Sequence, residues 1–146
     1  MTLTLIRFLT DRTTENEGKV LEKKSAGEKG YGLFAVCDIM ENDFVCEYWG
    51  LTETPFDDGI SCMVLSDKVS FVNPVGSSCI GQYINHQCRN ASCHWKEITG
   101  ENGIEMWIQA SRFIRAGEEL TIDYLMKKGE REKVFSCLCV YCIKHR

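Results

Sequence analysis

Two stretches decide the fold of this chain: GQYINHQC at residues 81–88 and GEELTIDY at residues 117–124. The first places an asparagine and a histidine between an aromatic residue and a cysteine. The second is strand-like and ends in a tyrosine. Each stretch alone has an ordinary structural interpretation, either a hydrogen-bonded Asn–His pair or an edge strand, so their meaning depends on the rest of the chain.

The remaining sequence predicts a mainly β protein. Short apolar runs rich in β-branched and aromatic residues indicate strands. The expected strands cover residues 3–9, 32–36, 44–49, 60–65, 69–72, 104–109 and 120–124. Turn sequences separate them, and Asn102-Gly103 predicts a hairpin. Helix is expected only at residues 77–83 and 127–134, and the polar residues 11–29 predict an exposed lead-in.

Length and composition indicate one soluble globular domain. The chain has 146 residues, of which 44% are hydrophobic and 26% charged. No apolar run approaches the roughly 18 residues that a membrane span needs. The first residues lack the apolar core and cleavage site of a secretory signal, so we expect the protein in the cytoplasm or nucleus.

The net charge of −4 argues against a nucleic-acid binder, which usually carries a basic patch. No nucleic-acid motif is present, and the acidic balance suits a cationic partner because its field concentrates opposite charge. Simple solubility is an equally good reason for that charge. If a basic peptide binds, the candidate contacts are Glu41, Asp43, Glu53, Asp57 and Asp58.

Seven of the nine cysteines fall into two groups, and Cys88 and Cys93 belong to neither. Cys137, Cys139 and Cys142 form a Cys-x-Cys-x-x-Cys cluster, which indicates a zinc site because three thiols in six residues rarely serve packing. A tetrahedral site needs a fourth ligand from elsewhere. Four scattered cysteines lie in apolar runs and are expected in the core: Cys37, Cys46, Cys62 and Cys79.

Gly30-Tyr31-Gly32, the two deciding stretches and the terminal cysteines together resemble the SET-domain protein lysine methyltransferases in order and spacing. The resemblance covers about residues 29–142. It implies a SET-domain (β-clip-like) fold of short strands, with a pseudo-knot in which the Asn–His segment and the strand at 119–124 thread past each other. The implied organisation is an N-terminal flank at 1–27, the SET domain at 28–125 and a zinc-bound post-SET tail at 126–146.

The same resemblance implies the site. S-adenosylmethionine would be bound by six residues: Gly30, Tyr31, Gly32, Asn85, His86 and Tyr124. Tyr124 would be the catalytic tyrosine, with its hydroxyl where methyl donor meets lysine. Tyr48 would be a second catalytic tyrosine that lines the lysine channel with Ile122. Asp123 is expected to be structural, since the chemistry requires no carboxylate base.

The resemblance also supplies the fourth zinc ligand. Cys88, beside the Asn–His pair, would complete the site with Cys137, Cys139 and Cys142. Cys93 or His145 remains an alternative to Cys88.

The chain departs from the family signature Arg-Phe-Ile-Asn-His-Ser-Cys-x-Pro-Asn at five positions. These are Gln82, Tyr83, Gln87, Asn90 and Ala91. The Asn-His-x-Cys kernel survives, so the departures affect local packing more than cofactor binding.

The resemblance therefore predicts transfer of methyl groups from S-adenosylmethionine to a protein lysine, in a histone tail in the nucleus. Two alternatives stay open: a methyltransferase for a non-histone lysine, and a catalytically silent SET-like module stabilised by zinc. A small zinc-finger nucleic-acid binder would explain the cysteines but none of the upstream motifs.

Overall fold

The computed structural model describes residues 20–50, 63–64, 71–72, 74, 78–101 and 103–125. These ranges contain nine strands and two short 3-10 helices, which confirms the mainly β prediction. The strands are β1 Leu21–Ser25, β2 Tyr31–Ala35, β3 Phe44–Tyr48, β4 Met63–Val64, β5 Phe71–Val72, β6 Asn85–His86, β7 Cys93–Gly100, β8 Gly103–Ala110 and β9 Glu119–Ile122. The helices are η1 Gly27–Lys29 and η2 Ile80–Tyr83. Neither helix in these ranges has the length or apolar character to span a membrane.

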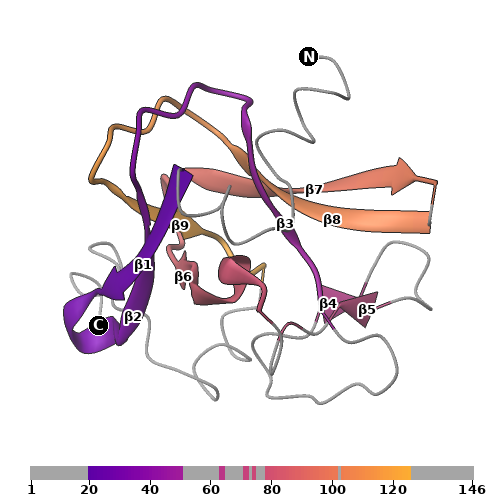
Figure 1. The fold of residues 1–146 in the computed structure, drawn as a ribbon, viewed down its shortest axis with the longest axis horizontal. Helices are drawn as coiled ribbons and strands as arrows, with labels where there is room; N and C mark the ends of the chain where they lie inside the picture. Colours follow the sequence, from indigo (N-terminus) through magenta and orange to yellow (C-terminus); the bar gives the residue numbers. More distant parts are fainter. Residues whose placement is uncertain are drawn as a thin grey trace.

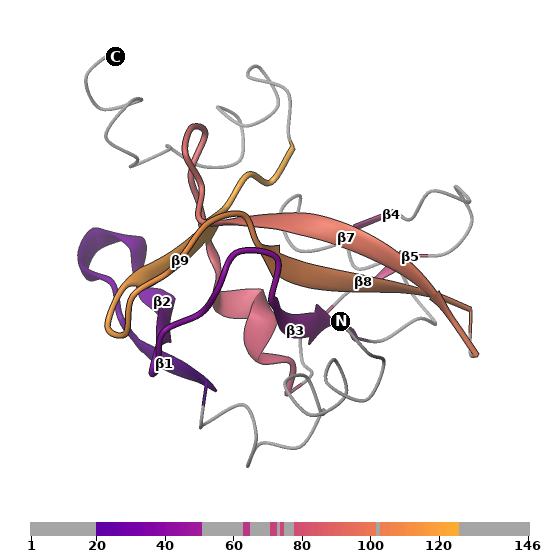
Figure 2. The ribbon, with the colours of Figure 1, turned by 90° about the horizontal axis from the view of Figure 1, so that it is seen from above.

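One curled sheet contains most of the strands, in the order β1-β2-β9-β7-β8-β3 (Figures 1 and 2). The β1–β2 and β7–β8 hairpins lie toward opposite ends, with β9 and β6 between them (Figure 1). β9 pairs antiparallel with β2, and parallel with both β6 and β7. β9 is therefore where segments far apart in sequence meet.

Four expected strands match β2, β3, β8 and β9 to within two residues at each end. The expected strands at 60–65 and 69–72 are described only at β4 and β5, which pair with each other. The predicted hairpin is confirmed, since β7 and β8 remain paired up to Gly100 and Gly103. The strand expected at 3–9 and the helix expected at 127–134 lie outside the described residues.

Three strands were not expected: β6, which is only two residues long, and β1 and β7, which carry several charged side chains. β1, with the sequence LEKKS, buries only Leu21 and exposes the other four side chains. Among the described residues it is the outer strand of the sheet, and four of its five side chains are exposed. β7 has the sequence CHWKEITG, and its Lys96 is exposed. In β1 and β7 backbone pairing, rather than apolar alternation, holds the element in place.

The core lies along the centre of the sheet. Leu33, Ile108, Ile114, Leu120 and Ile122 are each 0% exposed. Burying side chains of this size stabilises the fold by roughly 1.5–3 kcal/mol each. The core therefore centres on β9 and its neighbours, which fixes the strand that carries the second deciding stretch.

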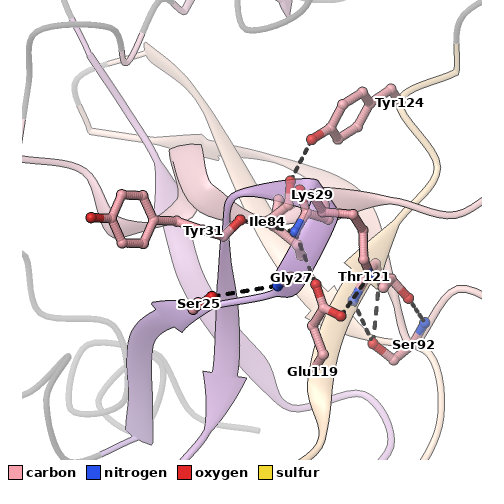
Figure 3. Close-up of polar contacts among 10 residues, drawn as sticks. Ser25, Gly27, Lys29, Tyr31, Ile84, Ser92, Glu119, Thr121 and Tyr124 are labelled. Carbon is pink, nitrogen blue, oxygen red and sulfur yellow. Dashed lines mark hydrogen bonds and ion pairs between the residues drawn. The ribbon is translucent and has the colours of Figure 1, made fainter. Parts of the chain in front are cut away.

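β9 is covered on both faces, so its polar residue needs a buried partner. Thr121 is 6% exposed and Ser92 is 0% exposed. Thr121 N donates to Ser92 Oγ at 3.0 Å, and Ser92 N donates to Thr121 Oγ1 at 3.3 Å (Figure 3). This reciprocal pairing satisfies groups that would otherwise cost free energy when buried.

A turn stabilised by a carboxylate leads into β9. Arg115 N donates to Glu118 Oε2 at 3.0 Å, and Arg112 forms a 2.6 Å ion pair with Glu118 Oε1. The Arg112 hydrogen bond holds the pKa of the Glu118 carboxyl below its ordinary value. These bonds stabilise the turn between Arg112 and Glu118, before β9 begins.

The cysteine expectations are partly confirmed and partly wrong. Cys46 and Cys79 are buried, as expected. Cys37 is exposed, because β2 ends at Ala35 and the chain then leaves the sheet. Cys62 lies outside the described residues.

Candidate functional site

The parallel pairing of β6 with β9 assembles the centre of the site. Asn85 lies opposite Thr121, and His86 lies opposite Ile122. Two segments that are more than thirty residues apart in sequence are therefore held side by side by the backbone. This is the contact that the expected threading of the two segments requires.

Tyr124 is bonded to the Asn–His segment through both its backbone and its side chain. Its backbone N–H donates to His86 Nδ1 at 3.0 Å. Its hydroxyl donates to the Ile84 carbonyl at 2.5 Å, as Figure 3 shows. The His86 and Tyr124 rings are tilted against each other, with centroids 5.1 Å apart. The hydroxyl position is thus fixed by the backbone just before Asn85.

These contacts determine the tautomer of His86. Because Nδ1 accepts from the Tyr124 N–H, the ring proton resides on Nε2. Nε2 lies 3.1 Å from Cys88 Sγ and can donate to it. Asp123 Oδ1 lies 3.8 Å from Nδ1 but accepts from Leu125 N at 2.8 Å. The neutral ring therefore points its N–H at the sulfur and not at the carboxylate.

Tyr48 joins the site through a tryptophan. Tyr48 is 5% exposed at the end of β3, and its ring packs edge-to-face on Trp95 with centroids 4.9 Å apart. Trp95 Nε1 donates to the Asp123 carbonyl at 2.9 Å, directly before Tyr124. Gly81 leaves room for this packing, since a Cβ there would lie 3.3 Å from Tyr48 Cδ2.

The Gly30 loop approaches the same centre from β2. Gly30 has φ +81°, a conformation that favours glycine, and a Cβ there would meet no atom within 4 Å. The Tyr31 carbonyl accepts from Asn85 Nδ2 at 3.0 Å. The Asn85 side chain, which the sequence predicted to be a site residue, therefore joins the loop to β6.

The Tyr31 ring projects outward and is 59% exposed. It lies edge-to-face with Tyr83, with centroids 6.3 Å apart. Lys23 Nζ lies 4.2 Å from the Tyr31 centroid and 4.0 Å from the Tyr83 centroid. Cation–π attraction to two rings holds β1, β2 and η2 together beside the loop.

Gly32 is required by space, not by an unusual backbone angle. A Cβ on Gly32 would lie 2.8 Å from Glu119 Oε1 and 2.9 Å from Ala26 Cβ. Both distances are shorter than real contacts, so a side chain at residue 32 would displace the Glu119 carboxylate.

We expect Gly32→Ala to lower the free energy of unfolding by about 1–3 kcal/mol, as overpacking of a filled site does. Urea unfolding measures the change. Gly27→Ala is the matched control, because Gly27 has φ +67° with open space around it. That control should cost about 1–2 kcal/mol through the backbone alone and leave Glu119 in place. A Gly32→Ala protein as stable as the unsubstituted chain would contradict the packing argument.

The departures at residues 82, 87 and 90 each have a local structural role. Gln82 Nε2 donates to the Cys79 carbonyl at 2.9 Å, and Gln87 Nε2 donates to the Arg89 carbonyl at 2.6 Å. Asn90 has φ +55°, which a proline ring cannot adopt. The loop from β6 to β7 therefore follows a path that asparagine permits and proline would not.

Of the expected zinc ligands, the described residues include only Cys88. Cys88 is half-buried beside His86, whereas Cys137, Cys139, Cys142 and His145 lie outside the described residues. Within the described ranges no group of three metal-binding side chains occurs.

Cys93 is 3% exposed, and burial raises the pKa of its thiol to about 12. Its side chain belongs to the core, which makes it a poor substitute for Cys88.

Several other predicted residues can be placed. Ile122 is fully buried in β9. Of the acidic candidates for a basic peptide, Glu41 is exposed and Asp43 half-buried, with Asp43 Oδ2 accepting from Met40 N at 3.1 Å. Glu53, Asp57 and Asp58 lie outside the described residues.

Two residues of the site, Trp95 and Glu119, were not predicted from the sequence. Trp95 lies in the unexpected strand β7, where its alternation with charged neighbours was the available signal. Glu119 lies within the quoted second stretch, but its partners Lys29 and Asn85 are 90 and 34 residues away. No local pattern indicates such a contact.

The curled sheet holds a tyrosine against an Asn–His segment through parallel strands. This arrangement is that of the SET domain, and the SET-domain family model matches residues 30–125. The chain belongs to the SET-domain family.

Several curated proteins of similar sequence are histone-lysine N-methyltransferases. A histone-lysine N-methyltransferase, H3 lysine-36 specific, from Coccidioides immitis is 36% identical over 110 residues, covering 66% of this chain and 11% of that protein. One of the same name from Candida albicans is 34% identical, covering 80% of this chain and 15% of that protein. A histone-lysine N-methyltransferase, H3 lysine-4 specific, from Yarrowia lipolytica is 34% identical, covering 75% of this chain and 10% of that protein. The chain thus spans a small part of each relative's length.

Solved structures are also similar. A humanized mutant of the Chaetomium thermophilum Polycomb Repressive Complex 2 bound to the inhibitor GSK126 superposes with a TM-score of 0.61 at 29% identity, covering 73% of this chain and 14% of that one. A second structure, ctPRC2 in an autoinhibited conformation bound to S-adenosylmethionine, gives a TM-score of 0.59 at 28% identity, covering 73% of this chain and 15% of that one. These likenesses extend the SET-domain assignment to the three-dimensional fold.

Proposed function

We propose that this chain catalyses methyl transfer from S-adenosylmethionine to the side-chain amine of a protein lysine. The observation that carries the proposal is the fixed Tyr124 hydroxyl, bonded to the Ile84 carbonyl beside the Asn85–His86 strand. Membership in the SET-domain family and a likeness to a structure bound to S-adenosylmethionine support it.

The residues present fit that methyl donor. The Gly30 loop leaves open space where a side chain would otherwise stand, and the Asn85 amide lies next to it. When bound, S-adenosylmethionine supplies a methyl group on a positively charged sulfur. Of the residues that the resemblance assigns to the cofactor, those in the Gly30 loop, in β6 and at Tyr124 are joined by hydrogen bonds.

The protein's own contribution is to orient groups and exclude water. The Tyr124 hydroxyl gives its proton to Ile84, so its oxygen lone pairs are the acceptors that can orient an amine N–H. Tyr48, which is buried, and Trp95, which is half-buried and bonded to the Asp123 carbonyl, supply packed aromatic surface next to Tyr124 in the chain. Burial of a lysine amine lowers its pKa and favours the neutral, nucleophilic form. Correct orientation of amine and methyl donor then supplies much of the rate.

We propose histone H3 as the substrate, with lysine 36 as the first candidate, because several relatives carry that specificity in their names. A nuclear location goes with this substrate. The test is mass spectrometry of H3 peptides spanning lysine 4 or lysine 36, each paired with a peptide in which arginine replaces that lysine. Methylation of a lysine in a non-histone protein only would overturn the histone assignment while leaving the reaction class intact.

The zinc site is part of the same proposal. Cys88 would join Cys137, Cys139 and Cys142 as four thiolate ligands, the donor set of a closed structural zinc site. The His86 N–H aimed at Cys88 Sγ suits a metal-bound thiolate, which such bonds orient. The zinc would thereby attach the C-terminal tail to the loop that follows β6.

We expect the chain to add two or three methyl groups to one lysine. In this family the residue two before the catalytic tyrosine influences product state, and here it is Ile122, which lacks a hydroxyl to hold a water molecule. Mass spectrometry at long reaction times measures the product distribution. Accumulation of monomethyl-lysine alone would contradict this expectation.

A further inference from the structure

Glu119, the first residue of β9, connects two parts of the site with its carboxylate. Oε2 lies 2.7 Å from Lys29 Nζ, at the end of η1 (Figure 3). Oε1 accepts from Asn85 Nδ2 at 2.9 Å. The Lys29 and Glu119 side chains are 29% and 20% exposed, so both bonds are largely shielded from water.

This carboxylate fixes the orientation of the Asn85 amide. Nδ2 donates to Glu119 Oε1 and also to the Tyr31 carbonyl at 3.0 Å. Neither oxygen carries a proton to donate, so a flipped amide would bring its own oxygen against two acceptors. Only one orientation therefore satisfies the contacts. Among the described residues, no donor bonds to Asn85 Oδ1.

An oriented amide oxygen accepts hydrogen bonds and cannot donate them. S-adenosylmethionine carries N–H donors at its ammonium group and on its adenine ring. We propose that Glu119 is a positioning residue, which together with Lys29 holds Asn85 so that Oδ1 accepts from an N–H donor of bound S-adenosylmethionine. This inference rests on the proposed function and assigns a role to a residue that touches Asn85, not the methyl donor.

The role requires a carboxylate because two donors converge on one side chain. A carboxylate has two acceptor oxygens, one for Lys29 and one for Asn85, whereas a carboxamide has only one. In a Glu119→Gln protein the Lys29 ammonium would attract that single oxygen and turn the amide NH₂ toward Asn85. The substituted side chain would then oppose the native orientation of Asn85, although its size and shape are unchanged.

The first test is a double-mutant cycle measured by calorimetry with S-adenosylmethionine. Glu119→Ala should raise the dissociation constant roughly 10-fold, as expected for loss of a charge-assisted hydrogen bond. Asn85→Ala should weaken binding at least as much. In the double variant the effects should not add, because both substitutions remove the same oriented oxygen. The turnover number at saturating cofactor should change much less than the dissociation constant.

The second test uses the glutamine variant, which preserves side-chain volume. Glu119→Gln should also weaken binding several-fold, within the usual range for a lost hydrogen bond. Adding Lys29→Met should restore much of the affinity, because the amide oxygen is then released to accept from Asn85. A residue that served only general stability would show no such rescue.

Glu118→Ala is the matched control, since it removes the neighbouring carboxylate and its Arg112 ion pair without reaching Asn85. Its dissociation constant should equal that of the unsubstituted chain. Glu119→Ala with unchanged affinity, additive effects with Asn85→Ala, or no rescue by Lys29→Met would each overturn the inference alone. An unsubstituted protein that binds no S-adenosylmethionine would overturn the proposed function and this inference together.

Discussion

Tyr124→Phe is expected to reduce methyl transfer by on the order of 100-fold or more, the loss typical of removing one preorganised polar contact to a transition state. The substitution removes the hydroxyl bonded to Ile84 and retains the ring packed against His86. Because that contact develops as amine and methyl approach, the loss should affect the turnover number and not cofactor affinity. Single-turnover kinetics and calorimetry measure the two quantities separately.

Asn85→Ala supplies the contrast for Tyr124→Phe. Its amide bonds to the Gly30 loop and to Glu119, so its loss should weaken cofactor binding directly. Thermal unfolding should show both variants folded. A Tyr124→Phe protein with an unchanged single-turnover rate would mean that the reacting groups meet elsewhere.

Removal of the proposed zinc is expected to have the second large effect, with methyl-transfer activity falling roughly 10–100-fold, the range seen when groups that support metal ligands are lost, and with weaker binding of the methyl donor. Metal binding supplies folding energy to a segment that cannot bury enough apolar surface alone. Cys88 contacts His86, which accepts from Tyr124, so loss of the metal should reach the site through two hydrogen bonds. Chelation followed by activity assays and calorimetry measures the two effects, and added zinc should reverse both.

Two cysteine substitutions separate this effect from general loss of a thiol. Cys88→Ala should lose the metal and weaken cofactor binding, whereas Cys37→Ala, at an exposed position outside the sheet, should do neither. Zinc content should also fall as pH decreases, since protons compete for thiolate ligands. Freshly purified, unchelated protein without zinc, or a Cys88→Ala protein that retains one zinc per chain, would refute the assigned ligands.

The fold could be predicted where a short apolar run rich in β-branched and aromatic residues marked a strand. Residues 32–36 and 44–49 are examples, and both match strands of the sheet. β1 was missed because an edge strand with one buried side chain has the composition of a loop. β7 was missed because its charged side chains hide the apolar alternation, while its backbone pairs over eight residues.

The site could be predicted in part. The resemblance nominated Asn85, His86 and Tyr124, and the structure brings these three together through the β6–β9 pair. The roles of Glu119 and Trp95 could not be predicted, since each depends on partners distant in sequence. Strand pairing over such separations is determined by the whole chain, so no local pattern carries it.

The measurement that tests the central proposal most directly uses S-adenosylmethionine labelled in its methyl group and the zinc-loaded chain with intact histone H3. We expect label in methylated lysine after digestion, and label lower by on the order of 100-fold or more when Tyr124→Phe replaces the unsubstituted chain. A protein that binds S-adenosylmethionine yet transfers no label to any lysine, across histones and a wide set of other proteins, would contradict the proposal and identify a silent SET-like module instead.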